Sequence, residues 1–153
     1  MATRSTIAIE LADGTIKKVY CHWDGYLSYN GKILKEHYSD PVKLLKLISK
    51  GAISSLGPEI GRKHPFSKVE LNIDAPDFKK KAKAYDNAQA KGYTKFYARD
   101  RGEQRTVDTY KDFETYFRSQ FEEYNYLFTK QGNWRVLHDE RGFELLDEEL
   151  QLA

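Results

Sequence analysis

The chain has 153 residues, and its 25 Lys and Arg nearly balance its 23 Asp and Glu, which leaves a formal net charge of +2. This length fits one domain with a single core, and so small a net charge excludes a strong overall attraction to nucleic acids or membrane surfaces. One cysteine excludes an internal disulfide and a zinc site with several thiolates. Because no stretch reads as a signal peptide or a membrane span, we expect a cytoplasmic protein with no membrane partner.

The first two strands are predicted to form a hairpin. Residues 4–12 alternate apolar and polar side chains, and Asp13-Gly14 is a turn that tolerates positive φ. Residues 15–23 continue the alternation on the other side of this turn.

Two short helices are expected next. From Ser28 the apolar residues change to a spacing of three and four, and this pattern ends before Asp40. Asp40 can cap a second helix that has Pro41 in its first turn and ends at Gly51. Both helices are predicted to pack on the hairpin.

The middle of the chain is less regular. Residues 57–78 are interrupted by Gly and Pro, and within them 69–74 fits either a short edge strand or an extended loop. Residues 77–92 have the composition of a polar helix, and 93–98 alternate like a strand.

The remaining elements complete the predicted fold. A charged turn at 99–105 is followed by an amphipathic helix at 112–121, whose stripe comprises Phe113, Tyr116, Phe117 and Phe121. A second hairpin joins 123–130 to 133–138 through Gln131-Gly132, and the acidic residues 142–153 are expected to seal an edge. The order predicts a single α+β domain over 1–153 with an insertion-like segment at 57–78. Its sheet is expected to be mostly antiparallel, with about five strands from two hairpins plus one strand, covered by three to four helices.

The end of the second strand carries groups that could face a ligand. Alternation is expected to turn three side chains toward the core and two toward solvent: Val19, Cys21 and Trp23 on the first face, Tyr20 and His22 on the second. Asp24 opens the next turn, and Tyr26 and Tyr29 follow. These groups can hydrogen-bond and stack on a polar ligand. The alternative is that they only stabilise their own loop.

The charged turn is the second candidate. Arg99 and Arg101 flank Asp100 just before Gly102, and two guanidinium groups can fork onto a phosphate. They can equally pair with Asp100 and Glu103. In the functional interpretation, this turn and the strand end share the mouth of one cleft.

Other chemistries have little support. Cys21 lacks an adjacent base, because His22 is expected on the opposite face of the strand. The four histidines lack metal-ligand spacing, so no metal and no cofactor are expected. The lysine run at 79–83 fits a solvated helix face as well as a nucleic-acid contact, and the small net charge argues against nucleic acid.

Several short motifs resemble a family of small bacteriophage proteins. They are YCHWDGY at 20–26, NG-x-x-L at 30–34, RDRGE at 99–103, and the YNYLF of 124–128 with Trp134. The resemblance covers 1–58 and 92–150. It implies an accessory protein that acts in host takeover or counter-defence.

Together these observations favour a non-enzymatic protein that sequesters a small nucleotide-like signalling ligand. The expected binding residues are Tyr20, His22, Trp23, Asp24, Tyr26, Tyr29, Arg99 and Arg101. One alternative is an inhibitor that binds a host protein directly. Another is a small phosphodiesterase or glycohydrolase with His22 and Asp24 as acid and base. A homo-oligomer is compatible with each.

Overall fold

A computed structural model describes residues 2–119, 122–138 and 142–152. Its strands are β1 (Ser5–Glu10), β2 (Ile16–Cys21), β3 (Ile53–Ser55), β4 (Lys95–Phe96), β5 (Asp108–Tyr110), β6 (Tyr124–Phe128), β7 (Trp134–Leu137) and β8 (Glu144–Leu145). A π-helical turn, η1 (Leu27–Gly31), precedes the α-helices α1 (Lys32–His37), α2 (Pro41–Ser49), α3 (Phe78–Ala90), α4 (Tyr97–Arg101), α5 (Phe113–Arg118) and α6 (Leu146–Leu152).

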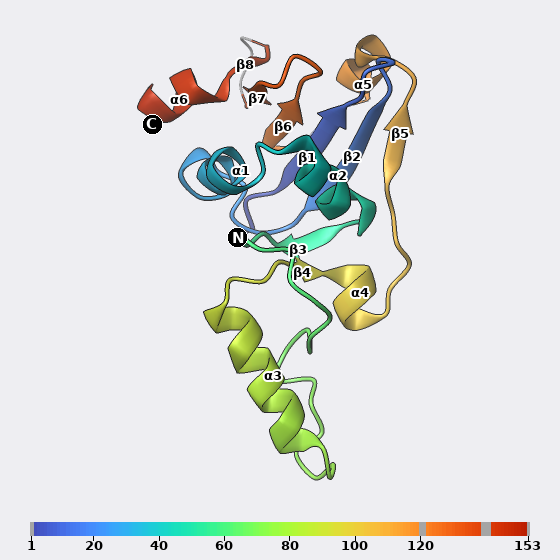
Figure 1. Ribbon diagram of the computed structural model, residues 1–153, viewed down its shortest axis with the longest axis vertical. Helices are drawn as coiled ribbons and strands as arrows, with labels where there is room; N and C mark the ends of the chain where they lie inside the picture. The colour runs from blue at the N-terminus through green and yellow to red at the C-terminus, as the bar shows by residue number, and fades with distance from the viewer. Residues whose placement is uncertain (1, 120–121, 139–141, 153) are drawn as a thin grey trace.

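The two predicted hairpins are confirmed and form the centre of the sheet (Figure 1). β1 and β2 pair antiparallel around Gly14, whose φ of +90° is the conformation that the Asp-Gly turn requires. β6 and β7 pair in the same way around Gly132.

The α+β class is confirmed, but the expected sheet of about five mostly antiparallel strands is wrong, and the expected three to four helices are too few, since the described residues form six α-helices. The described residues form an eight-stranded mixed sheet in the order β4-β3-β2-β1-β6-β7-β8, with β5 paired to β2. β1 and β6 are parallel, and so are β2 and β3. The missed strands β3, β5 and β8 have only two or three residues each, too few to show an alternation.

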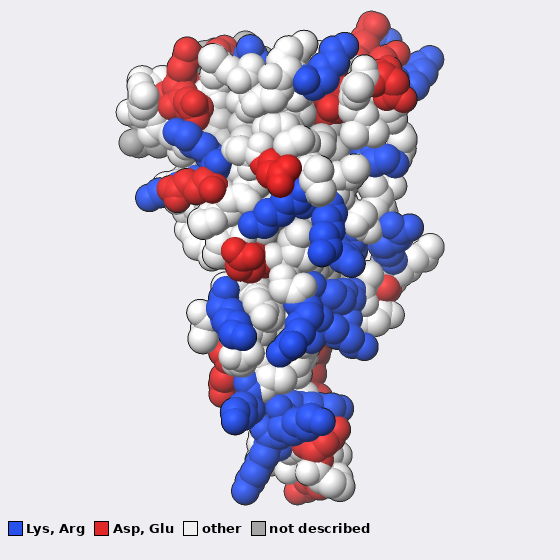
Figure 2. Space-filling view, in the orientation of Figure 1, with Lys and Arg blue, Asp and Glu red and all other residues white. Residues whose placement is uncertain are grey.

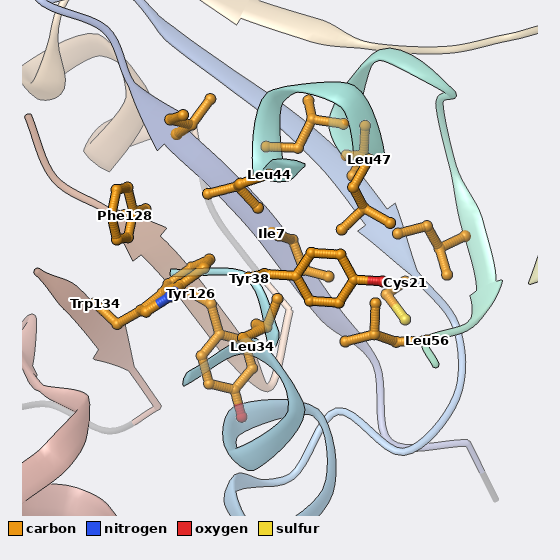
Figure 3. Close-up of a cluster of buried hydrophobic side chains, with 14 of the residues drawn as sticks. Ile7, Cys21, Leu34, Tyr38, Leu44, Leu47, Leu56, Tyr126, Phe128 and Trp134 are labelled. Atoms are coloured by element: carbon orange, nitrogen blue, oxygen red, sulfur yellow. The ribbon is translucent and has the colours of Figure 1, made fainter. Parts of the chain in front are cut away.

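One face of the sheet carries the main core (Figure 3). Ile7 of β1, Cys21 of β2 and Tyr126 of β6 are fully buried on this face. They pack against side chains from α1, α2 and the start of α6, including Leu34, Leu44, Leu47 and Leu146. Tyr38, which follows α1, lies inside the same cluster and donates its hydroxyl to the Gly57 carbonyl oxygen at 2.7 Å. The expectation that both short helices pack on the hairpin is therefore confirmed.

The opposite face has a smaller core beneath α5. Ala8, Ile16 and Leu127 are buried there against Tyr116. Asp112 caps this helix by accepting a hydrogen bond from the Thr115 backbone N–H at 2.8 Å. The helix predicted at 112–121 is confirmed as α5, although Phe121 lies outside the described residues.

Residues 61–93, which we call the arm, extend from the end of the sheet (Figure 1). The arm contains the predicted polar helix as α3, preceded by a loop of turns in which 69–74 form no strand. Only Ala88 of α3 is buried. The arm joins the sheet through a bridge between Glu59 and Tyr93, next to the two-residue strand β4. The strand predicted at 93–98 is shorter because the chain turns into α4 at Tyr97.

Within the described ranges, none of the helices has the length and apolar run that crossing a bilayer requires.

Candidate functional site

The strand end at 20–24 departs from regular alternation. The backbone N–H groups of His22 and Trp23 both donate toward β3, to the carbonyl oxygens of Ile53 and Ser54 at 3.0 Å. In a regular strand, consecutive N–H groups point to opposite neighbours, so the pleat is broken here. Trp23 consequently leaves the core face and is 44% exposed, which corrects the expectation that it packs in the core with Cys21.

Tyr20 and His22 lie together on the other face of β2 and are partly exposed, as alternation predicts. The Tyr20 hydroxyl and His22 Nδ1 are 2.7 Å apart and form a hydrogen bond. The Trp23 ring meets the imidazole edge-on, with centroids 4.7 Å apart. Burial raises the pKa of Tyr20 above its usual value, so its hydroxyl stays protonated at neutral pH.

The next turn places two tyrosines at the surface. Asp24 adopts a φ of +56°, a left-handed conformation that aspartate tolerates better than most residues. Tyr26 and Tyr29 are 38% and 39% exposed, with ring centroids 6.2 Å apart. Burial, and then the negative charge of Asp24, raise the pKa of Tyr29. No hydrogen bond among the described residues joins Asp24 to the His22 imidazole.

Cys21 is a core residue. Its thiol is fully buried, and the Asn30 amide donates to Sγ at 3.4 Å. Burial raises the pKa of this thiol to about 12, so the thiolate that a nucleophile requires is scarce at neutral pH.

Arg99 holds the base of the arm to the sheet. Its Nη1 donates to the carbonyl oxygens of Ile60 and Gly61 at 2.9 and 3.2 Å, and its Nη2 donates to that of Thr94 at 2.9 Å. Nε and Nη2 also donate to the Asp100 carboxylate. Because all three nitrogens are engaged, Arg99 is a framework residue and does not offer its guanidinium to a phosphate.

Asp100 completes this framework. Its side chain is fully buried and accepts hydrogen bonds from the backbone N–H groups of His64 and Phe96, at 3.1 and 2.8 Å. The buried His64 ring lies alongside, with Nε2 3.6 Å from Asp100 Oδ2. One carboxylate thus fixes the arm, β4 and α4 to one another.

Arg101 differs from Arg99. It ends α4 just before Gly102, whose φ of +77° closes the helix. Its guanidinium lies over the rings of Phe66 and Tyr97, 4.4 and 5.1 Å from their centroids, and its Nε donates to Glu103. Among the described residues nothing accepts from Nη1 or Nη2.

A cleft of about 710 Å³ opens between α4 and the arm. It is lined by Lys63, His64, Pro65, Phe66, Ser67, Glu70, Leu71, Asp77, Lys80, Lys81, Ala84, Asp100, Arg101 and Gly102. Of the eight predicted binding residues, Arg101 alone belongs to this lining. None of the residues 20–29 lines this cleft.

Sequence reasoning missed the aromatic wall of the cleft. Phe66 lies in the Gly- and Pro-interrupted segment, where no periodicity singles it out. Lys95 of β4 lies over the rings of Phe66 and Tyr85, 5.1 and 5.4 Å from their centroids, and thereby links the loop to α3. Desolvation lowers the pKa of Lys95 below its usual value. The basic residues around Phe66 in RKHPFSK were the signal in the sequence that could have indicated this part of the cleft.

The near-zero net charge conceals a separation of charge along the molecule. Residues 61–102 carry eleven Lys and Arg against five Asp and Glu. Figure 2 shows Lys and Arg gathered over the lower part of the molecule and the arm, with Asp and Glu more frequent toward the opposite end. The total charge is therefore no argument against an anionic partner of the arm.

The titratable groups of the described residues include no cluster of three His, Cys, Asp or Glu side chains that could hold a metal ion. Comparisons with family models, with curated proteins and with solved structures gave no match.

Proposed function

We propose that the protein binds a small nucleotide-like ligand in the cleft between α4 and the arm, and sequesters it without converting it. The observation that carries this proposal is the combination, in a cleft of about 710 Å³, of an aromatic wall at Phe66 with the cationic side chains of Lys63, Lys80 and Arg101. This volume lies in the range of small-molecule sites, roughly 300–1,000 Å³.

The lining suits a planar ring that carries phosphate. Phe66 is partly exposed and offers an apolar surface beside the guanidinium of Arg101. Arg101 uses Nε for Glu103, which leaves its two terminal nitrogens to donate to paired phosphate oxygens. Lys63 and Lys80 add positive charge without ion-pair partners among the described residues.

Sequestration is favoured over catalysis because three ionisable side chains of the cleft, those of Asp100, His64 and Asp77, are already engaged in hydrogen bonds or an ion pair. Asp100 and His64, which line it, are both tied into the hydrogen bonds that anchor the arm. Asp77 is paired with Lys81 at 3.2 Å. A binding protein of this kind fits the counter-defence or host-takeover context that the resemblance to phage proteins implies.

The proposal is tested with a fluorescent nucleotide, N-methylanthraniloyl-ADP, titrated into the intact protein. Arg101→Ala is expected to weaken binding at least about tenfold, because a charge-assisted hydrogen bond contributes about 1.5–3 kcal/mol. Arg62→Ala is the matched control, since it removes an exposed guanidinium of the arm that does not line the cleft. Equal affinities of Arg101→Ala and Arg62→Ala for N-methylanthraniloyl-ADP would refute the cleft as the binding site.

Mass spectrometry of small molecules released by heat from protein purified out of phage-infected cells tests sequestration itself. An intact nucleotide-like compound is the expected result. A cleaved product would instead favour the phosphodiesterase or glycohydrolase alternative.

A second candidate function is inhibition of a host protein by direct binding. It is favoured by the exposed rings of Trp23, Tyr26 and Tyr29, since exposed aromatic side chains are enriched at protein interfaces. Under this alternative, a host protein co-purifies with the unmodified chain and is lost when Trp23 and Tyr26 are changed to Ser. Arg101→Ala should not affect that partner.

A further inference from the structure

One face of α3 is basic and exposed. Helical periodicity brings four lysines and one asparagine onto this face: Lys79, Lys80, Lys83, Asn87 and Lys91, the last at the C-cap. All five side chains are exposed. We call this set the basic face of α3.

The acidic residues of the helix do not neutralise the basic face. Asp86 is paired with Lys68 of the arm loop at 2.7 Å, and Asp77 with Lys81 at 3.2 Å. Among the described residues, the four lysines of the basic face have no ion-pair partner. The face therefore presents uncompensated positive charge.

The loop of the arm supports α3 from the other side. Two lysine ammonium groups lie over the ring of Tyr85 in α3. Nζ of Lys68, from the arm loop, is 6.0 Å from the ring centroid, and Nζ of Lys95, from β4, is 5.4 Å from it. Figure 1 shows α3 extending away from the end of the sheet. A partner can reach the basic face without contacting the more acidic remainder of the chain, where 18 Asp and Glu outnumber 14 Lys and Arg.

We propose that the basic face of α3 binds the phosphate backbone of double-stranded DNA, with the helix seated in the major groove. An α-helix is about 10–12 Å across with its side chains, and the major groove of B-DNA is about 12 Å wide. Lys79, Lys83, Asn87 and Lys91 follow one another four residues apart, which places them at intervals of about 6 Å along the helix. Lysines in such a row can contact successive phosphates, and the Asn87 amide can pair with a base edge.

This inference is independent of the proposed ligand in the cleft. Of the basic face, only Lys80 also lines the cleft, so the other lysines can be changed without altering the lining. The two proposals can therefore fail separately.

The test is fluorescence anisotropy of a labelled DNA duplex of about 25 base pairs with the full chain. Four phosphate contacts predict a slope of log affinity against log salt of about −3.6, and hence a loss of about 100-fold in affinity between roughly 50 and 200 mM salt. The combined variant Lys79→Ala, Lys83→Ala, Lys91→Ala is expected to reduce that slope to about −1 and to weaken binding by more than about 30-fold at the lower salt.

A matched control distinguishes binding by the basic face of α3 from a general effect of the protein's positive charge. Lys32→Ala, Lys111→Ala and Lys130→Ala together remove the same charge from exposed lysines outside the arm, and they should leave DNA affinity within about twofold. Circular dichroism is expected to show that both combined variants keep their helices. Binding of N-methylanthraniloyl-ADP should be the same in the α3 variant as in the unmodified protein.

An RNA duplex of the same sequence tests whether α3 binds in the major groove. Its major groove is deep and too narrow for a helix, so affinity at least about tenfold below that of DNA is expected. The proposal is overturned by an absence of duplex binding at about 50 mM salt, by equal affinities of the two combined variants, or by equal binding of RNA and DNA.

Discussion

Arg99 and Asp100, consecutive residues of α4, form a buried ion pair in which Arg99 Nε donates to Asp100 Oδ1 at 3.0 Å and Nη2 donates to Oδ2 at 3.2 Å. The same carboxylate accepts the backbone N–H groups of His64 and Phe96. The pair therefore joins three segments that are distant in sequence, and it positions one wall of the cleft.

Asp100→Asn is expected to lower the free energy of unfolding by about 2–4 kcal/mol, because it removes a buried charge that two backbone donors and a guanidinium share. Urea unfolding followed by circular dichroism measures the change. Asp108→Asn, at an exposed position of β5, is the control and should stay within about 0.5 kcal/mol of the unmodified protein. A similar small loss for Asp100→Asn would show that the carboxylate is not needed to hold the arm.

Gly57→Ala is expected to be among the most destabilising single-methyl additions in the chain. Gly57 has no positive φ, yet a Cβ atom there would overlap the carbonyl oxygen of Gly92, where the arm returns to the sheet. We expect a loss of about 3 kcal/mol, since backbone cannot move aside as a flexible side chain can. Gly14→Ala meets no neighbour and should cost only the strain of its positive φ, about 1 kcal/mol. The reverse order of the two losses, measured by thermal or urea unfolding, contradicts the close approach of Gly57 to Gly92.

Stability is expected to fall at alkaline pH in part through Tyr38. Burial raises the pKa of Tyr38 to about 12 from 10.0, so the unfolded state loses its phenolic proton first. The contribution of the Tyr38 hydroxyl to the free energy of unfolding is complete below pH 10 and is lost as the pH rises toward 12. Tyr38→Phe should cost about 1 kcal/mol at pH 8 by removing the hydrogen bond to Gly57, and should give a shallower decline in guanidinium unfolding between pH 10 and 11.

Tyr26→Phe, at an exposed ring, is the control for that experiment. It should leave both the stability at pH 8 and its alkaline decline unchanged. An alkaline decline in Tyr38→Phe as steep as in the unmodified chain would contradict the role of the buried hydroxyl.

Trp23 should dominate the quenchable fluorescence of the protein. The chain has two tryptophans, of which Trp23 is 44% exposed and Trp134 only 6%. Trp23→Phe is expected to remove most of the iodide-quenchable emission and to change the unfolding free energy by less than about 0.5 kcal/mol. Persistent quenching together with a large loss of stability would place Trp23 in the core.

The candidate site could be predicted only in parts. The positions of Tyr20 and His22 on one face of β2 follow from alternation, and Arg101 lies at a cleft. The engagement of Arg99 could not be predicted, because Arg99 donates to carbonyl oxygens 38 and 39 residues earlier in the chain. Nothing in the local pattern RDRGE distinguishes that guanidinium from the one two residues later.

The amino-acid sequence by itself determined the two hairpins, the two helices that follow the first hairpin, the amphipathic helix α5 and the polar helix of the arm, because turn residues and side-chain periodicity act over a few neighbouring positions. The tertiary structure alone decided that β1 pairs parallel with β6, that the pleat breaks at His22 and Trp23, and that the arm folds against α4 to enclose a cleft. These outcomes depend on hydrogen bonds and packing between segments far apart in the chain, whose geometry no local periodicity specifies.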